Sequence, residues 1–264
     1  MPNEGAPVRV VDAVGEDDPA IEIARPRLDR PGGAIASYAA WPRAGASGAG
    51  VVVVQHIWAV DAPIRHVVRR FAKAGYVAIA PDLFSRFGAP DGDDETDYTK
   101  FTPLLARLDD ATVDDDMVAG ATWIRERAGS APSQRPPKVG INGYCMGGTI
   151  ALRAAENDRA FDASAVWYGR IRKAPAEGQP PPETSRAVAK RIRIPILGSY
   201  GALDTGIPVE DVREFDASLA VPHDIKVYDD AGHAFFDETR SRYSESASFD
   251  AWPRTLAWFS KYLR

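Results

Sequence analysis

The chain has 264 residues and a formal net charge of -5, and 45% of its residues are hydrophobic against 26% that are charged. This balance is typical of a globular protein with enough apolar residues for one large core. The negative charge offers no basic surface to nucleic acid or to an anionic membrane. No apolar run approaches the ~20 residues that a membrane-spanning helix needs, so both kinds of partner are excluded.

The cysteine content restricts the chemistry further. A single cysteine excludes an internal disulfide, and one Cys with four His does not suit a structural zinc cluster. The residues from Met1 to Gly5 lack the basic and apolar regions of a signal peptide, so we expect a cytoplasmic protein. A lone cysteine is either a small buried hydrophobe or a reactive thiol, and its sequence neighbours decide between the two.

The N-terminal part of the chain predicts a loop followed by strands. Residues 1–30 are rich in Pro, Asp, Glu, Gly and Arg and predict an irregular or partly extended lead-in. Residues 31–264 predict a single domain. Alternation over residues 34–41 predicts a strand that Pro42 ends. The β-branched run Val51–Val54 suits a strand buried on both faces, as in a parallel sheet.

Helices and strands alternate along the rest of the chain. The predicted elements are helices at 64–74, 113–128, 146–156, from Pro208 and at 249–262, and strands at 77–80, 138–142, 163–168, 194–200 and 225–228. Asp114, Asp115 and Asp116 are placed in the first turn of their helix, where they favour its dipole. Residues 84–97 and 170–191 predict surface loops. This alternation predicts an α/β fold with a doubly wound, mostly parallel sheet flanked by helices.

Residues 143–147 read GYCMG and lie between a predicted strand and a predicted helix. The form G-x-C-x-G is that of a nucleophile elbow, with Cys145 in place of the usual serine. The two glycines avoid clashes in a tight turn, and the helix N-terminus favours the thiolate. We therefore predict Cys145 as the nucleophile of an α/β-hydrolase fold, with the Met146 N–H as one oxyanion-hole donor.

The acid and the base follow from chain order. The fold requires the order nucleophile, acid and histidine, each after the C-terminal end of a strand. Of the two histidines after Cys145, His223 precedes the last predicted strand and is expected on a surface loop, whereas His233 follows that strand and is the candidate base. Asp204 follows the preceding strand and is the candidate acid that would accept the imidazole Nδ1–H. The alternative for Asp204 is a turn or helix-capping residue.

At these residues the chain resembles the dienelactone hydrolase (carboxymethylenebutenolidase) family of α/β-hydrolases, from about Ile35 to the C-terminus. The motifs that carry the resemblance are residues 80–84 (APDLF), 143–148 (GYCMGG), 201–208 (GALDTGIP) and 231–235 (AGHAF). The resemblance implies that a thiolate attacks an ester or lactone and that water activated by histidine hydrolyses the thioester, without metal or organic cofactor. By family position the Ile57 N–H is the second oxyanion donor, and losing such a donor typically costs ~3–4 kcal/mol of transition-state stabilisation.

One departure from the family pattern lies next to this donor. The family has a glutamate in a Q-E-I-[FW]-G motif, and that carboxylate contacts the resting thiol. Residues 55–59 of this chain read QHIWA, so His56 stands in its place. An imidazole favours the thiolate where a carboxylate opposes it. His56 is therefore expected either to activate Cys145 or to carry a second proton, or else it only fills the pocket wall.

A second departure concerns the substrate. Family members that cleave dienelactone carry an arginine shortly after the catalytic histidine, where this chain has Asp237. The cations that could replace it, although such side chains are more often solvated, are Arg86, Lys100, Arg240 and Arg242. The aromatic residues expected nearby are Trp58, Phe84, Phe235 and Phe236. We expect a pocket for neutral or larger apolar esters, with His56, Trp58, Arg86 and Phe235 as its modulating residues.

Other functions stay open from the sequence. The same thiolate and oxyanion hole would serve other electrophiles, such as phosphotriesters or thioesters. A catalytically silent member that binds a ligand is another alternative, although an intact Cys, Asp and His in the required order argues against it. A Rossmann-type enzyme is set aside because Val51–Val54 is not followed by G-x-G-x-x-G. We expect a monomer or homodimer acting on a small ester or lactone.

Overall fold

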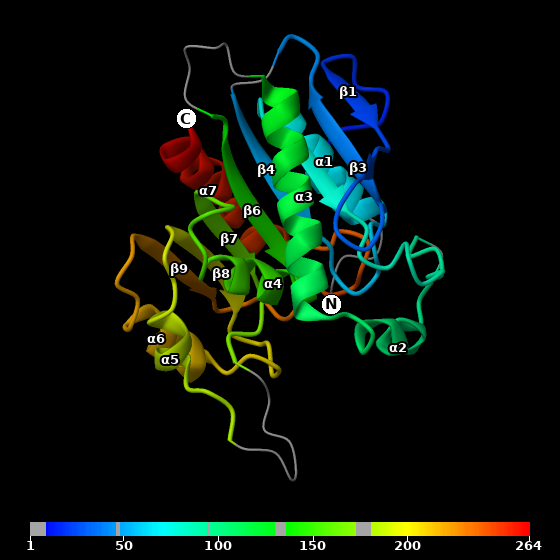
Figure 1. Cartoon of the computed structure of the whole chain (residues 1–264). Helices are drawn as coiled ribbons and strands as arrows, with labels where there is room; N and C mark the ends of the chain where they lie inside the picture. The colour runs from blue at the N-terminus through cyan, green and yellow to red at the C-terminus, as the bar shows by residue number, and fades with distance from the viewer. Residues whose placement is uncertain (1–8, 46–47, 94, 130–135, 173–180) are drawn as a thin grey trace.

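Strands and helices alternate through a computed structural model of the chain, which describes residues 9–45, 48–93, 95–129, 136–172 and 181–264 (Figure 1). The strands in this part of the chain are β1 (Ile21–Ala24), β2 (Arg27–Leu28), β3 (Ile35–Pro42), β4 (Ala49–Val54), β5 (Val77–Pro81), β6 (Lys138–Tyr144), β7 (Ala163–Trp167), β8 (Ile196–Gly201) and β9 (His223–Tyr228). The helices are α1 (Ala62–Lys73), α2 (Thr102–Leu105), α3 (Asp110–Ala128), α4 (Met146–Ala154), α5 (Ser185–Ala189), α6 (Val209–Asp216) and α7 (Glu245–Leu263), with a 3₁₀ turn at Tyr98–Lys100.

The strands form one mixed sheet in the order β1-β3-β5-β4-β6-β7-β8-β9, with β2 beside β3. β3 pairs antiparallel with β1, β2 and β5, and every other pairing in the described sheet is parallel. All six residues of β4 are buried, as its β-branched run predicts, because β4 lies in the interior of the sheet with helices on both faces. The predicted doubly wound, mostly parallel sheet is therefore confirmed.

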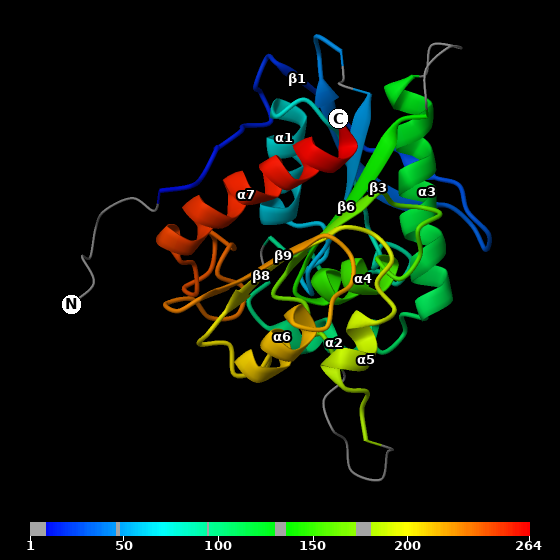
Figure 2. The same cartoon turned by 90° about the vertical axis from the view of Figure 1, so that its left-hand side faces the viewer.

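Helices cover the sheet on both faces. α3 and α4 lie on one face, and α1 and α7 lie on the other (Figures 1 and 2). Glycines in the central strands let these helices approach closely. A Cβ at Gly50 of β4 would lie 2.3 Å from a methyl group of Ile124 in α3, and one at Gly140 of β6 would lie 2.5 Å from the ring of Phe259 in α7. No helix in the described residues is both long and apolar enough to cross a membrane.

The N-terminal segment adds strands to the edge of the sheet. Within the stretch 1–30, for which the sequence predicts an irregular or partly extended lead-in, residues 21–24 and 27–28 are extended and form β1 and β2. The sheet thus begins before residue 31. The loop expected at 170–191 contains the short helix α5, which Thr184 caps, while its residues 173–180 lie outside the described residues.

The predicted start of the helix at residue 113 is wrong. The helix begins at Asp110, and the side chain of Asp109 caps it by accepting the N–H of Thr112. Asp116 is therefore not in the first turn. It is buried and forms ion pairs with Arg30, at 2.5 Å, and with Arg86. These cations come from elsewhere in the chain, so helix periodicity alone does not reveal the pairing.

The close packing of α7 on β6 predicts the effect of one methyl group. We expect Gly140→Ala to destabilise the protein by about 1–3 kcal/mol, because the new Cβ forces the buried ring of Phe259 out of its position. The measurement is the free energy of unfolding in urea. The matched control is Gly232→Ala, whose Cβ would meet no atom closer than 4.0 Å. Equal stabilities of the two variants would contradict this account of the packing.

Candidate active site

The turn between β6 and α4 carries Cys145. This residue has φ +54° and ψ -114°, a backbone conformation that is strained for any residue with a Cβ. A Cβ at Gly143 would lie 1.9 Å from the carbonyl oxygen of Gly147, and a Cβ at Gly147 would lie 2.4 Å from the carbonyl oxygen of Val54. Only glycine therefore fits at positions 143 and 147, two residues before and two residues after the cysteine. The turn holds the thiol just beyond the C-terminal end of β6.

Cys145, His233 and Asp204 form one chain of hydrogen bonds. The Nε2 atom of His233 lies 3.0 Å from Cys145 Sγ, and its Nδ1 atom lies 2.6 Å from an oxygen of Asp204. Asp204 is buried, and its other oxygen accepts the N–H of Gly206 at 2.9 Å. The acid and the histidine follow β8 and β9, so parallel strands bring them to the edge where Cys145 lies. His223 is the exposed first residue of β9, at the opposite end of that strand.

The charges around Cys145, His233 and Asp204 favour charge separation between the thiol and the imidazole. Burial raises the pKa of Cys145, but the hydrogen bond to His233 and the positive charges of His233 and His56 outweigh it, and the thiol pKa falls below its ordinary value. Burial lowers the pKa of His233, but hydrogen bonds to Asp204 and Cys145 and their negative charges raise it to about 10. Both directions stabilise a thiolate–imidazolium pair at neutral pH.

The two expected oxyanion-hole residues lie beside the thiol. Ile57 and Met146 both line the groove into which Cys145 opens. The Met146 N–H, at the start of α4, also lowers the pKa of the thiol. Ile57 follows β4 in a loop. Ala59 of this loop has φ +67° and forms an isolated β-bridge with His56. The structure thus places Ile57, Met146 and Cys145 along the same groove.

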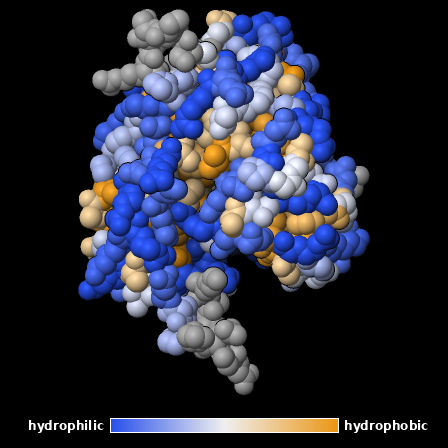
Figure 3. All heavy atoms as spheres, in the orientation of Figure 1, coloured by the Kyte–Doolittle hydropathy of each residue, from blue (hydrophilic) through white to orange (hydrophobic). Residues whose placement is uncertain are grey.

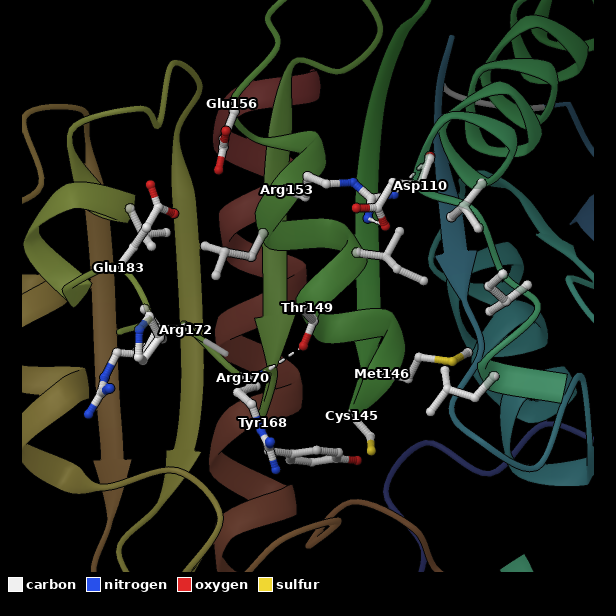
Figure 4. A pocket seen from close by; sticks show the side chains of 18 of the residues that line it. Asp110, Cys145, Met146, Thr149, Arg153, Glu156, Tyr168, Arg170, Arg172 and Glu183 are labelled. Carbon is white, nitrogen blue, oxygen red and sulfur yellow. Dashed lines mark hydrogen bonds and ion pairs between the residues drawn. The ribbon is translucent and has the colours of Figure 1, made fainter. Parts of the chain in front are cut away.

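A groove of about 650 Å³ leads away from Cys145 along α4. Its surroundings are visible in Figure 3, where the surface is hollowed below α3, between the side that carries α5 and α6 and the side that carries α2. In Figure 4, Cys145 and Tyr168 lie at one end of the groove and Glu156 lies at the other. The groove is therefore elongated, and the thiol is close to one of its ends.

His56 is buried between two carboxylates. Its Nε2 atom lies 2.8 Å from Asp61, which also caps α1, and its Nδ1 atom lies 3.8 Å from Asp237. Burial lowers the pKa of His56, but the negative charges of Asp61 and Asp237 and the hydrogen bond to Asp61 outweigh it and raise that pKa. Among the described residues no hydrogen bond joins His56 to Cys145, so its charge acts on the thiol through space. Asp237, the second departure from the family pattern, serves here as a partner of His56.

None of the four residues expected to modulate the pocket lines the groove, since His56 is buried as described above and the other three lie elsewhere. Arg86 is bound to buried Asp116, as described above. Phe235 is fully buried against the rings of Trp167, Tyr168 and Tyr228. Trp58 lies edge-on to Phe101 and under the guanidinium of Arg240, which is 4.1 Å from its ring. These side chains do not line the groove because each of them packs against or pairs with another residue of the protein.

Sequence reasoning missed Tyr168, which follows β7 with φ +39° and packs the edge of its ring against His233 at 5.3 Å between centroids. It also missed Asp61, although an aspartate just before a proline-containing helix start is an N-cap signal. The groove residues Arg170 and Thr149, which share a hydrogen bond of 2.9 Å, carry no motif that could have placed them. In the described residues no group of three or more His, Cys, Asp or Glu side chains could hold a metal ion.

Comparisons with known proteins agree with this geometry. A family model described as "Dienelactone hydrolase family" matches residues 35–263. A Salmonella typhimurium protein named "Putative carboxymethylenebutenolidase" is 36% identical over 216 residues, which cover 80% of this chain and 77% of that protein. A protein of the same name from Methylorubrum extorquens is 32% identical and covers 97% of this chain and 87% of its own length.

A solved structure is also similar. The crystal structure of a "Putative Dienelactone Hydrolase" from Klebsiella pneumoniae superimposes with a TM-score of 0.79 and 33% identity, and the match covers 92% of this chain and 100% of that one. Together with the sheet order, this similarity confirms the predicted α/β-hydrolase fold.

The hydrogen bond between Cys145 and His233 predicts the acidity of the thiol. Because the chain has one cysteine, the rate of alkylation by iodoacetamide reports on Cys145 alone. We expect its dependence on pH to give a pKa below the ~8.5 of a free thiol, since the folded protein stabilises the thiolate. His233→Ala removes the largest stabilising contact, and it should raise this pKa. A pKa that is the same in both proteins would contradict the thiolate–imidazolium pair.

Proposed function

Because the chain belongs to the dienelactone hydrolase family, we propose that it hydrolyses carboxylic esters or lactones, with Cys145 as nucleophile, His233 as acid and base, and Asp204 as the orienting carboxylate. The observation that carries this proposal is the hydrogen-bonded chain of the three side chains, at 3.0 and 2.6 Å, on a strained turn at a helix N-terminus. A buried cysteine with a merely structural role requires neither the strain nor the histidine.

In the first half of the reaction the thiolate of Cys145 attacks the carbonyl carbon and forms a C–S bond. The N–H groups of Ile57 and Met146 donate to the oxygen on which negative charge develops. His233 then gives its Nε2 proton to the leaving oxygen as the C–O bond breaks. The products are an alcohol and a thioester on Cys145, or, for a lactone, one ring-opened thioester.

In the second half a water molecule attacks the thioester. His233, now neutral, accepts a proton from the water, and the C–S bond breaks to restore the thiolate and the imidazolium. Asp204 accepts the Nδ1–H throughout, which fixes the tautomer of His233 and stabilises its positive charge. The same thioester intermediate arises with any ester, so the mechanism does not by itself select the substrate.

We also propose that His56 promotes formation of the thiolate. The negative charge of Asp61, with the hydrogen bond to it, raises the pKa of His56, and a positive His56 lowers the pKa of Cys145. A glutamate at this position would have the opposite charge and the opposite effect. The resting thiol is then more reactive in this chain than in a protein with a carboxylate at position 56.

Two variants test the catalytic proposal. With p-nitrophenyl acetate, wild-type protein should release a burst of p-nitrophenol and carry an acetyl group on Cys145 that mass spectrometry detects. Cys145→Ala should lose both. Asp204→Asn should lower kcat by about 10²–10⁴-fold, because the imidazole is left without its charged partner and in the wrong tautomer.

A matched pair of histidine variants serves as the control for this test. His233→Gln should lose the activity, whereas His223→Gln, at an exposed residue, should keep it. A Cys145→Ala variant that hydrolyses the ester like wild type would refute the proposed nucleophile. A wild-type protein that shows neither burst nor acetylation with any ester or lactone tested would instead favour a ligand-binding member of the fold.

The effect of His56 has its own test. His56→Gln removes the charge and His56→Glu reverses it, so the pKa of Cys145 in iodoacetamide alkylation should rise in the first variant and rise further in the second. His223→Gln should leave it unchanged. Identical thiol pKa values in wild type, His56→Gln and His56→Glu would show that His56 only fills the pocket wall.

A further inference from the structure

The floor of the groove is one face of helix α4. Met146, Thr149, Ile150 and Arg153 all line the groove, and their spacing of three or four residues places them in a row along the helix. The row starts beside Cys145 and runs to the C-terminal end of α4. Since α4 has nine residues, the floor is about 14 Å long at 1.5 Å per residue.

The side walls of the groove are largely apolar. Leu105, Leu108 and Val113 line it from the α2–α3 side, and Ile171 and Val188 line it from the β7–α5 side. Walls on both sides of a helical floor make a channel rather than a flat patch. A volume of about 650 Å³ lies within the ~300–1,000 Å³ typical of ligand pockets. A small lactone bound at Cys145 would leave most of these walls in contact with water.

The far end of the groove carries ion pairs between neighbouring elements. They join Arg153 to Asp110 and Asp114, and Arg191 to Glu156 and Glu183. Two guanidinium groups thus face four carboxylates in this cluster, which leaves an excess of negative charge. Figure 4 shows Asp110, Arg153, Glu156 and Glu183 at this end, away from Cys145. Among the described residues, both guanidinium groups of this cluster are thus already paired with carboxylates.

We propose that this groove binds the unbranched, uncharged acyl chain of the substrate, with room for roughly ten carbons along its ~14 Å floor. The inference rests on the proposed function, because the chain is positioned by its carbonyl carbon at Cys145. His233 protonates the leaving oxygen, so the alcohol lies on the side of the imidazole. The acyl chain leaves the carbonyl past Met146 and follows α4. Medium-chain esters, rather than small lactones, are then the substrate class that uses the whole site.

The excess of negative charge at the far end adds a second criterion. An acyl chain that ends in a carboxylate would bring its charge close to Glu156 and Glu183, which lie at that end. A chain that ends in a methyl group meets no such repulsion. The groove therefore discriminates between a monoester of a dicarboxylic acid and an alkanoyl ester of the same length.

The test is the dependence of kcat/KM on acyl-chain length for p-nitrophenyl esters from acetate to dodecanoate, each below its critical micelle concentration. We expect kcat/KM to rise about two- to fourfold per methylene group and to level off near ten carbons. Lengthening the alcohol of acetate esters should produce no such rise. The p-nitrophenyl monoester of decanedioic acid should be a poorer substrate than the decanoate.

Two exposed apolar residues give a matched pair of variants. Leu105 lines the groove and is 37% exposed, whereas Val118 of α3 is 45% exposed and lies outside it. Leu105→Lys should lower the ratio of kcat/KM between decanoate and acetate by about tenfold, through loss of apolar contact and a charge in the wall. Val118→Lys adds the same charge and should retain the wild-type ratio.

The outcomes separate this inference from the proposed function. A Cys145-dependent burst with acetate, together with a flat or falling chain-length profile, overturns the acyl groove and leaves the hydrolase intact. If no ester gives a burst, calorimetric measurement of decanoate and acetate binding to Cys145→Ala still tests whether the groove binds an acyl chain. Tighter binding of decanoate that Leu105→Lys weakens supports the groove, and equal binding of the two acids overturns it.

Discussion

The close approach of three backbone segments at the turn around Cys145 determines the geometry of the whole site. Gly147 lies against the carbonyl oxygen of Val54 at the end of β4, and Gly143 lies against Gly147 itself, with no room for a side chain at either glycine. This contact fixes at once the position of the thiol, the direction of the Met146 N–H and the axis of α4. The strained φ of +54° at Cys145 is maintained because the surrounding backbone leaves it no alternative.

The loop that carries His233 is held separately. Glu238, five residues after His233, lies 2.6 Å from His66 and 3.0 Å from the buried guanidinium of Arg70, and both of these residues belong to α1. Burying a charge is costly unless it is paired, so this ion pair constrains the loop strongly. The position of His233 thus depends on contacts that do not involve the thiol, and its hydrogen bonds to Cys145 and Asp204 connect two independently anchored parts of the protein.

The sequence predicted what depends on local pattern and chain order. The elbow, the positions after β8 and β9 and the parallel sheet follow from glycine spacing, apolar runs and the alternation of elements, and the structure brings Cys145, Asp204 and His233 together as expected. Contacts between side chains that are far apart in the sequence could not be predicted from it. The contact of Arg86 with Asp116 and the burial of Phe235 depend on which charge or ring lies across the core, and no periodicity reports that. The edge strand β1 was missed because its four residues are too few for a pattern to stand out from the polar stretch around them.

The residues that follow His233 are therefore a poor guide to what this pocket accepts. Phe235 is used in the core, and Asp237 is a partner of His56, so neither is free to contact a substrate. The groove is built instead from α4, whose buried side packs on β6 and β7 while its other side runs away from the thiol. The turn that positions Cys145 thus also orients the floor of the groove. The proposed reactivity and the proposed selectivity therefore have a common structural origin in the strained strand-to-helix connection at Cys145.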